Sequence, residues 1–297
     1  MTSTPTLFDR RTIARRRADL LAVGRPEEAF LLDLVADDVT ERLMTVKRVF
    51  ASALAIGGPT DAIARAVAAS GRAERVTRAD VFAAGPAGRC PVDVVVDDEH
   101  LPFADGAFDL VVCGLTQQWV NDLPGALAQI RRCLKPDGLF LTTFAGGDTL
   151  AELREALAAA EEERTGGVSP RVAPMTDVRD LGRLLQRAGF ALPVADQDKL
   201  TLRYATPFDL MRDLKAFGAT NALVERSRGL TTPRLLARAA EIYAARHTDP
   251  DGRLRASLTL VSASGWVPHE SQQKPLSPGS AKTRLADALG TREIKLR

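Results

Sequence analysis

The sequence predicts an α/β protein built on a doubly wound, mostly parallel sheet. Two observations support this fold class. Short apolar runs recur along residues 51–145, and the run DLVVC at 109–113 is typical of a strand buried on both faces. Between these runs lie segments whose apolar residues repeat at three- and four-residue steps, as in helices that cover a sheet. Strands and helices that alternate in this way connect through right-handed crossovers.

The clearest strand–helix–strand unit begins with residues 109–113. Asp122 opens its helix, because a short acidic side chain can accept hydrogen bonds from the first turn. Pro136 cannot continue a helix, and Gly138 suits a backbone angle that other residues resist, so the helix is expected to end there. Residues 139–144 (LFLTTF) then form the next strand.

Further strands and helices precede this unit. One strand is expected within residues 50–56 (FASALAI), a second at 76–80 (VTRAD), and a helix at 62–67 between them. Residues 1–50 are expected to form an N-terminal helical segment whose arginine-rich first helix is solvated. The second helix carries an apolar stripe that would pack on the sheet or over its mouth, formed by Phe30, Leu34, Val35, Val39, Leu43, Val46 and Phe50.

The C-terminal half adds helices and one antiparallel strand to an expected domain of residues 51–271. A helix-rich insertion at 146–256 is expected to cap the mouth of the sheet. Thr149 and Glu152 fit a capping box at the start of its first helix. Alternating apolar and small polar residues at 257–267 predict the last strand, running antiparallel.

Composition excludes several classes of protein. The 297 residues carry a net charge of +2, so no global field favours nucleic acid or an anionic membrane. No apolar run approaches the roughly 18 residues of a membrane span, and no secretory signal is visible. Cys90, Cys113 and Cys133 lack metal-ligand spacing, which predicts free thiols in a reducing compartment. Lys, Pro, Ser and Gly dominate residues 272–297 and predict a flexible tail.

Three motifs in order carry a resemblance to a known family. They are DDEHLPF at 97–103, GAFDLV at 106–111 and RRCLKPDG at 131–138. At this spacing they resemble the second half of the S-adenosylmethionine-dependent methyltransferase core. The resemblance implies a seven-stranded Rossmann-like sheet with a helical cap, and S-adenosylmethionine as the cofactor. The alternative is another doubly wound α/β domain with chance copies of these strings.

The turn after the first strand departs from the family's glycine-rich pattern. It reads Gly57-Gly58-Pro59-Thr60-Asp61, so Pro59 and Asp61 stand where further glycines are expected. In one interpretation the loop still binds the cofactor, with Asp61 near its positively charged sulfonium or ammonium group. In the other, the fold persists without the ligand, and Thr60 or Asp61 only caps the following helix.

The resemblance places the remaining cofactor contacts at the carboxyl ends of the strands. Asp80 ends the second strand, where a carboxylate can accept both ribose hydroxyls. Asp97 falls where the family places an acid against the adenine amino group, and Asp98 and Glu99 are expected to be its solvated neighbours. Trp119 either lines the pocket or packs in the core. The candidate cofactor-binding residues are Gly57, Gly58, Asp61, Asp80, Asp97, Asp98, Gly114 and Gln117. No catalytic residue is assigned.

Beyond the core the resemblance narrows to one family. GGDTLAELR at 146–154, SPRVAPMT at 169–176, LLQRAGF at 184–190 and HESQ at 269–272 are similar to the methyltransferase-like assembly factors of respiratory complex I. That family is linked to arginine hydroxylation of a complex I subunit, which implies a protein partner. Malonyl-carrier-protein methyltransferases of biotin synthesis are a more distant resemblance.

The expected function is S-adenosylmethionine-dependent modification of a protein side chain in complex I assembly. Methyl transfer requires little beyond in-line positioning and desolvation. The alternatives are an arginine hydroxylase on the same fold and a non-catalytic assembly scaffold. Hydroxylation often uses iron, but His100, His247 and His269 form no His-x-Asp/Glu pair, and no metal ligand is predicted. The expected location is the cytoplasm of a bacterial cell, with the mitochondrial matrix as the alternative.

Overall fold

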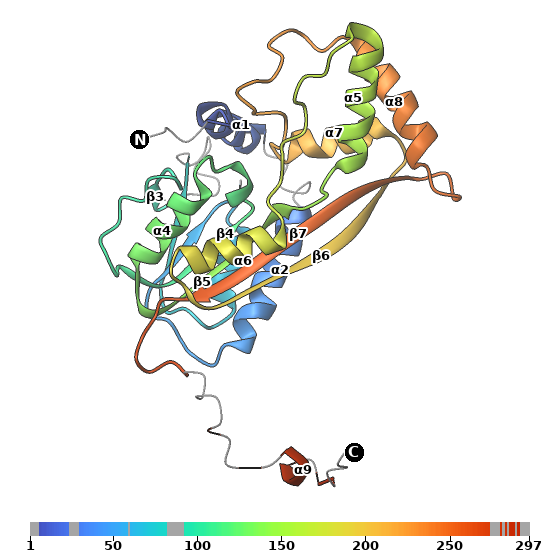
Figure 1. Ribbon diagram of the computed structural model, residues 1–297. Helices are drawn as coiled ribbons and strands as arrows, with labels where there is room; N and C mark the ends of the chain where they lie inside the picture. The colour runs from blue at the N-terminus through green and yellow to red at the C-terminus, as the bar shows by residue number, and fades with distance from the viewer. Residues whose placement is uncertain are drawn as a thin grey trace.

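A computed structural model describes residues 6–23, 30–58, 60–81, 92–273 and a few positions between 280 and 291. Pro59, Cys90 and most of the expected C-terminal tail lie outside the described residues. Figure 1 shows one sheet with helices on both of its faces. Its strands are β1 (Ala53–Ile56), β2 (Val76–Asp80), β3 (Val94–Val95), β4 (Phe108–Gly114), β5 (Leu134–Gly146), β6 (Ala191–Tyr204) and β7 (Leu254–Trp266).

The sheet confirms the predicted doubly wound, mostly parallel α/β fold. Its strand order is β3-β2-β1-β4-β5-β7-β6. The first five strands in this order pair in parallel, whereas β7 is antiparallel to both β5 and β6. The winding reverses between β1 and β4. Open α/β sheets form a ligand crevice at such a point, outside the carboxyl ends of the strands.

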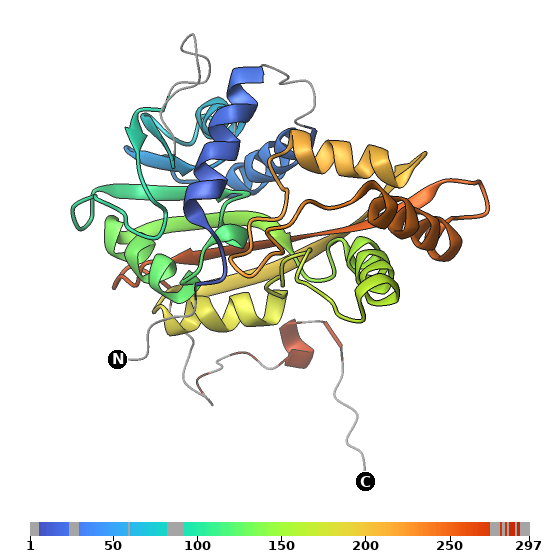
Figure 2. The same cartoon turned by 90° about the horizontal axis from the view of Figure 1, so that it is seen from above.

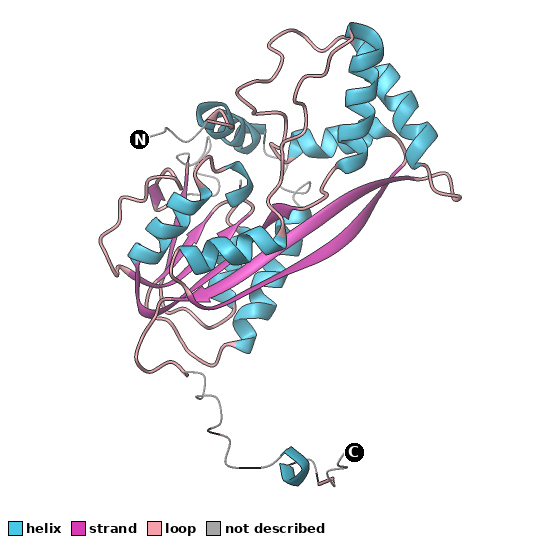
Figure 3. Ribbon diagram, in the orientation of Figure 1, coloured by secondary structure: helices cyan, strands magenta, loops and turns pink. Residues whose placement is uncertain are grey.

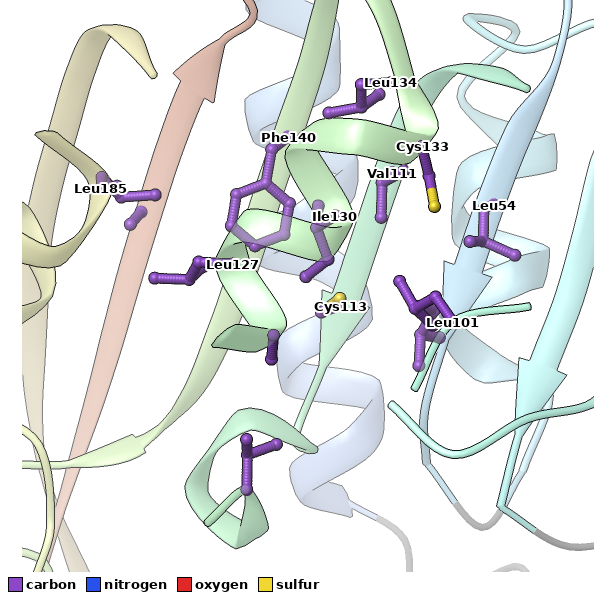
Figure 4. Packing of buried hydrophobic residues seen from close by; sticks show 14 of the residues in the cluster. Leu54, Leu101, Val111, Cys113, Leu127, Ile130, Cys133, Leu134, Phe140 and Leu185 are labelled. Atoms are coloured by element: carbon purple, nitrogen blue, oxygen red, sulfur yellow. The ribbon is translucent and has the colours of Figure 1, made fainter. Parts of the chain in front are cut away.

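Helices cover both faces of the sheet (Figure 3). They are α1 (Arg10–Val23), α2 (Phe30–Thr45), α3 (Ala62–Ala69), α4 (Leu123–Cys133), α5 (Ala151–Thr165), α6 (Val178–Arg187), α7 (Pro207–Ala216), α8 (Pro233–His247), the short α9 (Leu285–Ala288) and a 3₁₀ turn, η3 (Gln117–Trp119). On one face Leu127 and Ile130 of α4 pack with Phe140 of β5 (Figure 4). On the other, Leu43 of α2 and Val67 of α3 belong to a second buried cluster. Both layers hold the strand ends in fixed positions.

A third cluster lies where β6 and β7 extend beyond the rest of the sheet (Figure 1). Helices α5, α7 and α8 gather there, and Leu157, Leu210 and Ile242 contribute one buried side chain from each helix. This layer falls within the predicted helix-rich insertion. It overhangs the sheet on the side of β6 and β7.

The predicted capping box at the start of α5 is wrong. The Thr149 hydroxyl donates to the carbonyl of Gly146 at 2.7 Å, and Leu150 precedes the helix in a left-handed conformation with φ of 57°. The Glu152 carboxylate accepts a hydrogen bond from the backbone N–H of Ser257 at 3.0 Å. Tertiary contacts with β7 therefore replaced the local capping interaction.

The reason expected for Gly138 is also wrong. The left-handed residue near the start of β5 is Asp137, with φ of 61°. A Cβ atom at Gly138 would lie 2.8 Å from the carbonyl oxygen of Lys135. Close approach of the backbone, rather than an unusual angle, requires glycine at this position.

Helix α1 is not the solvated helix that the sequence predicted. Seen from above, it lies across the carboxyl edge of the sheet (Figure 2). Arg17 is only 7% exposed, and Thr12 and Ile13 are buried as well. The arginines of this helix therefore do not all face water, because acidic residues of the sheet edge bind two of them.

Asp9→Ala is expected to lower the free energy of unfolding by about 1 kcal/mol at neutral pH, because Asp9 caps α1. Its carboxylate accepts hydrogen bonds from the Thr12 N–H at 3.0 Å and the Thr12 hydroxyl at 2.7 Å. These bonds lower the pKa of Asp9 from 3.8 to about 2. A lowered folded-state pKa means that this stability is present above pH 3.8 and is lost as the pH falls through about 2. Urea unfolding of both proteins across that range checks the prediction, and a pH-independent difference would contradict it.

Candidate functional site

Two glycines at the end of β1 bring it against β4. Gly57 and Gly58 have φ of 108° and 83°, a region that side chains rarely adopt. A Cβ atom at Gly57 would lie 2.5 Å from the carbonyl oxygen of Gly114 and 2.1 Å from Cγ2 of Thr116. Gly114 is itself tight, since a Cβ atom there would lie 2.6 Å from the side chain of Ile63. Glycine is therefore required at Gly57 by the contact with β4 and at Gly114 by the contact with α3.

Gly57→Ala is expected to destabilise the protein by about 1–3 kcal/mol from backbone strain, with a further loss from the contact with Gly114. Gly71→Ala is the matched control. Gly71 also has a left-handed φ, 66°, but a Cβ atom there would meet no heavy atom of the described residues within 4 Å. Thermal unfolding of both variants separates the destabilisation caused by backbone strain from that caused by the contact with Gly114. Equal losses in the two would show that the contact contributes nothing.

Asp61 is paired on its own helix. Its carboxylate lies 3.0 Å from Nε of Arg65, one turn further along α3. Asp61 makes no side-chain cap, and the Thr60 hydroxyl accepts a hydrogen bond from the N–H of Ala62 at 3.3 Å instead. Within the described chain, no hydrogen bond links Asp61 to the other candidate cofactor residues. Its place beside the cofactor stays a prediction.

Asp80 is the most buried acid at the carboxyl edge, with 1% exposure. Its Oδ1 accepts hydrogen bonds from Nη1 of Arg17 at 2.8 Å and from the N–H of Val81 at 2.7 Å. Its Oδ2 has no hydrogen-bond partner among the described residues. Burial raises the pKa of Asp80, and the charge of Arg17 acts in the opposite direction. One buried carboxylate oxygen is therefore available to a ligand hydroxyl.

A second group of unsatisfied polar atoms follows β4. Thr116 and Gln117 are 1% and 2% exposed. The Thr116 hydroxyl, both amide atoms of Gln117 and Oε1 of Gln118 find no partner within the parts of the chain that the structure describes. Buried polar groups are nearly always paired with protein, water or a ligand, so these atoms are candidate ligand contacts. Sequence reasoning singled out Gln117 but missed Thr116.

The acids expected near the adenine differ from the prediction in which of them is exposed to solvent. Asp97 has a side chain that is 44% exposed, whereas Asp98 is buried. Both carboxylates pair with Nη2 of Arg10, at 2.9 Å in the case of Asp97. The expectation that Asp98 and Glu99 are solvated is therefore wrong. Arg10 compensates the charge of Asp98 inside the fold, and the Glu99 side chain is 14% exposed with its carboxylate 3.9 Å from Nε of Arg10.

Arg10 and Arg17 are the site residues that the sequence analysis missed. They stand seven residues apart, and two turns of an α-helix put such positions on one face. Arg10 binds the acids after β3, and Arg17 binds the acid at the end of β2. Their spacing was the available signal, but an arginine-rich helix is more often solvated. The ion pairs of these two arginines hold α1 over the crevice.

These observations fit an adenosine cofactor. Asp80 would hold the ribose hydroxyls through its free oxygen, and the unpaired groups of Thr116 and Gln117 would bind the base or the amino-acid portion. Gly57 and Gly58 allow the tight turn after β1, which packs against Thr116 and Leu32. A ribose that took both oxygens of Asp80 would displace the Arg17 guanidinium, and α1 and the cofactor would then compete for one carboxylate.

A cavity of about 380 Å³ adjoins the crevice under α5 and α7. Leu115 and Gln118, which follow β4, line the end nearest the crevice. Trp119 also lines the cavity. Its ring packs edge-to-face on Phe8, with ring centroids 5.6 Å apart, so Trp119 both lines the pocket and packs in the core. The size falls within the range of small-molecule and side-chain pockets, roughly 300–1,000 Å³.

The remaining candidates lie elsewhere. His269 is exposed and its Nδ1 lies 2.7 Å from the Ser271 hydroxyl, while His247 lies beside Glu155. Among the described residues, no group of three or more His, Cys, Asp or Glu side chains is placed to hold a metal. None of the described helices has the length and apolar content needed to span a bilayer.

The strand order and the crevice at its reversal define a class I methyltransferase fold. The YcgJ protein of Bacillus subtilis shares the architecture with a TM-score of 0.51 at 16% identity, over 78% of this chain and 98% of that one. This similarity shows the fold alone. Residues 54–142 also match the model of the family described as "Methyltransferase domain".

Curated relatives identify the family within this class. The chain is 38% identical to "Arginine-hydroxylase NDUFAF5, mitochondrial" of Danio rerio, over 95% of this chain and 89% of the relative. The rat protein of that name is 45% identical, over 66% of this chain and 57% of its own length. A "Malonyl-[acyl-carrier protein] O-methyltransferase" of Halorhodospira halophila is 37% identical, over 87% of this chain and 88% of the relative. The chain belongs to the arginine-hydroxylase NDUFAF5 family, within the S-adenosylmethionine-dependent methyltransferase superfamily.

Proposed function

We propose that this protein hydroxylates an arginine side chain of a respiratory complex I subunit. The observation that carries the proposal is the 38% identity with the zebrafish arginine hydroxylase along 95% of the chain. Methyl transfer was the main activity expected from the sequence, but the methyltransferase fold does not by itself specify that reaction. The relatives favour the alternative, hydroxylation on the same fold.

The geometry supports separate roles for the crevice and the cavity. Asp80, Thr116 and Gln117 would hold the adenosine cofactor that the fold implies, and α1 would shield it from water. The cavity between Leu115 and α7 would receive the substrate side chain. Hydroxylation replaces a C–H bond by C–OH. With dioxygen as the oxidant, the second oxygen atom leaves as water, using two protons and two electrons from a reductant.

S-adenosylmethionine-dependent methyl transfer is the second candidate, and one observation favours it. The chain is 37% identical to a malonyl-carrier-protein methyltransferase over most of both chains. Bound S-adenosylmethionine would supply an electrophilic methyl group at the crevice. The same crevice residues would serve either reaction. The two reactions differ in co-reactant, because hydroxylation needs an oxidant and a reductant, whereas methyl transfer needs only the methyl donor and a nucleophilic acceptor.

Mass spectrometry of complex I subunits from a strain with and a strain without this protein tests the proposal. The expected result is one arginine that carries an additional oxygen atom only when the protein is present. An additional methylene group on the same or another side chain would favour methyl transfer. Identical masses in both strains would contradict both reactions and support the assembly scaffold.

A further inference from the structure

Among the described residues, the cavity beneath α7 contains one acid that is not paired with a cation. Asp213 and Arg171 are the charged residues among those that line it. Nη2 of Arg171 lies 2.8 Å from Oε1 of Glu161, so its charge is already matched. Asp213 forms no ion pair with any residue that the structure describes. The cavity therefore presents one uncompensated negative group.

Tyr204 lies beside this acid in the cavity. It ends β6, and Asp213 lies on α7, so the two side chains approach from different elements. Burial, together with the hydrogen bond to Asp213, raises the pKa of Tyr204. The phenol therefore stays protonated next to the carboxylate. Asp213 lines the cavity, so its carboxylate can reach a ligand there.

Apolar side chains form most of the remaining wall. Leu210 and Leu214 come from α7, Leu202 from β6, and Phe217 follows α7. An aliphatic stem can lie against such a surface while a cationic head reaches an acid at its edge. A guanidinium suits this arrangement, because its planar set of N–H donors matches a carboxylate in a paired hydrogen-bond geometry.

We propose that Asp213 anchors the guanidinium of the substrate arginine and thereby determines side-chain specificity, an inference that rests on the proposed function. Tyr204 lies beside the carboxylate, and the leucines of α7 receive the arginine methylenes. A malonyl group would bring a second negative charge next to Asp213. The cavity therefore selects a cationic acceptor and disfavours the acidic one.

Binding of two small probes tests the anchor directly. Nα-acetyl-L-arginine amide and Nα-acetyl-L-citrulline amide have nearly the same shape, but only the first is charged. Calorimetry on the full chain is expected to show arginine probe binding at least about tenfold tighter than the citrulline probe. Asp213→Asn is expected to abolish this difference, and Asp213→Glu to retain part of it. Glu241→Gln is the control, since Glu241 lies on α8 with a side chain 66% exposed and does not line the cavity.

Equal affinity for both probes, no binding of the arginine probe, or an unchanged preference in Asp213→Asn would overturn the anchor. Expressing wild-type protein or each variant in a strain that lacks the protein distinguishes failure of the anchor from failure of the proposed function. If wild-type protein restores the hydroxylated arginine and Asp213→Asn restores it equally, only the anchor fails. If wild-type protein restores no hydroxylation, the proposed function fails, whatever the probes show.

Discussion

Arg17→Ala is expected to lower the free energy of unfolding by about 3–5 kcal/mol, because it leaves the Asp80 carboxylate buried without its counter-ion. The two side chains are 8% and 1% exposed and lie 2.8 Å apart. Water therefore cannot replace the guanidinium at little cost. The same substitution also removes the contact that fastens the middle of α1 to the end of β2, so α1 is expected to become more mobile.

Urea unfolding followed by tryptophan fluorescence measures this loss. The double variant Arg17→Ala/Asp80→Asn is expected to recover much of it, since a neutral amide needs no counter-ion. Arg15→Ala is the matched control, because Arg15 is an exposed arginine on the same helix. A loss below about 1 kcal/mol, or no recovery in the double variant, would show that the pair is hydrated like a surface ion pair.

Loss of the Asp80 carboxylate is expected to weaken S-adenosylmethionine binding by about 10- to 100-fold. Hydrogen bonds from ribose hydroxyls to a charged acceptor contribute roughly 1.5–3 kcal/mol, which sets this range. The unpartnered Oδ2 of Asp80 supplies the acceptor. The effect is expected even though the turn after β1 departs from the usual glycine pattern, because Asp80 stands on a different strand.

Calorimetric titration with S-adenosylmethionine compares the Arg17→Ala variant with the Arg17→Ala/Asp80→Asn double variant. Because both proteins lack the guanidinium, the difference between their affinities measures the contribution of the Asp80 carboxylate. Asp105→Asn is a control, since that carboxylate is 81% exposed and pairs with Arg132. Equal affinities in the two Arg17 variants would show that the adenosine does not contact Asp80. No binding to the wild-type chain would remove the cofactor role of the crevice and favour the scaffold interpretation.

Local sequence patterns predicted most of the sheet. Residues 109–113 lie within β4, Asp80 ends β2, and 139–144 lie within β5, because buried strands need continuous apolar runs whatever surrounds them. The glycines at the end of β1 were also predicted correctly as residues of a tight turn. The α5 capping box failed because Thr149 and Glu152 found partners on β7, more than a hundred residues away in sequence.

The candidate site was predictable only in part. Asp80 could be assigned from its place at a strand end. The burial of Asp98 could not, since it depends on Arg10, which is distant in sequence and approaches from a helix laid across the edge. Asp213 and Tyr204 carried no motif at all. They became candidates only when β6 and α7 placed them in one cavity beside the crevice.

The sequence by itself determined the class of fold, the family and the strand ends that carry acids, because hydrophobic periodicity and short motifs act over a few residues. The tertiary structure alone decided which charges are paired, which polar atoms remain unsatisfied and where the cavity lies. Those properties depend on distances between side chains that are far apart along the chain, and such distances exist only after the helices have packed on the sheet.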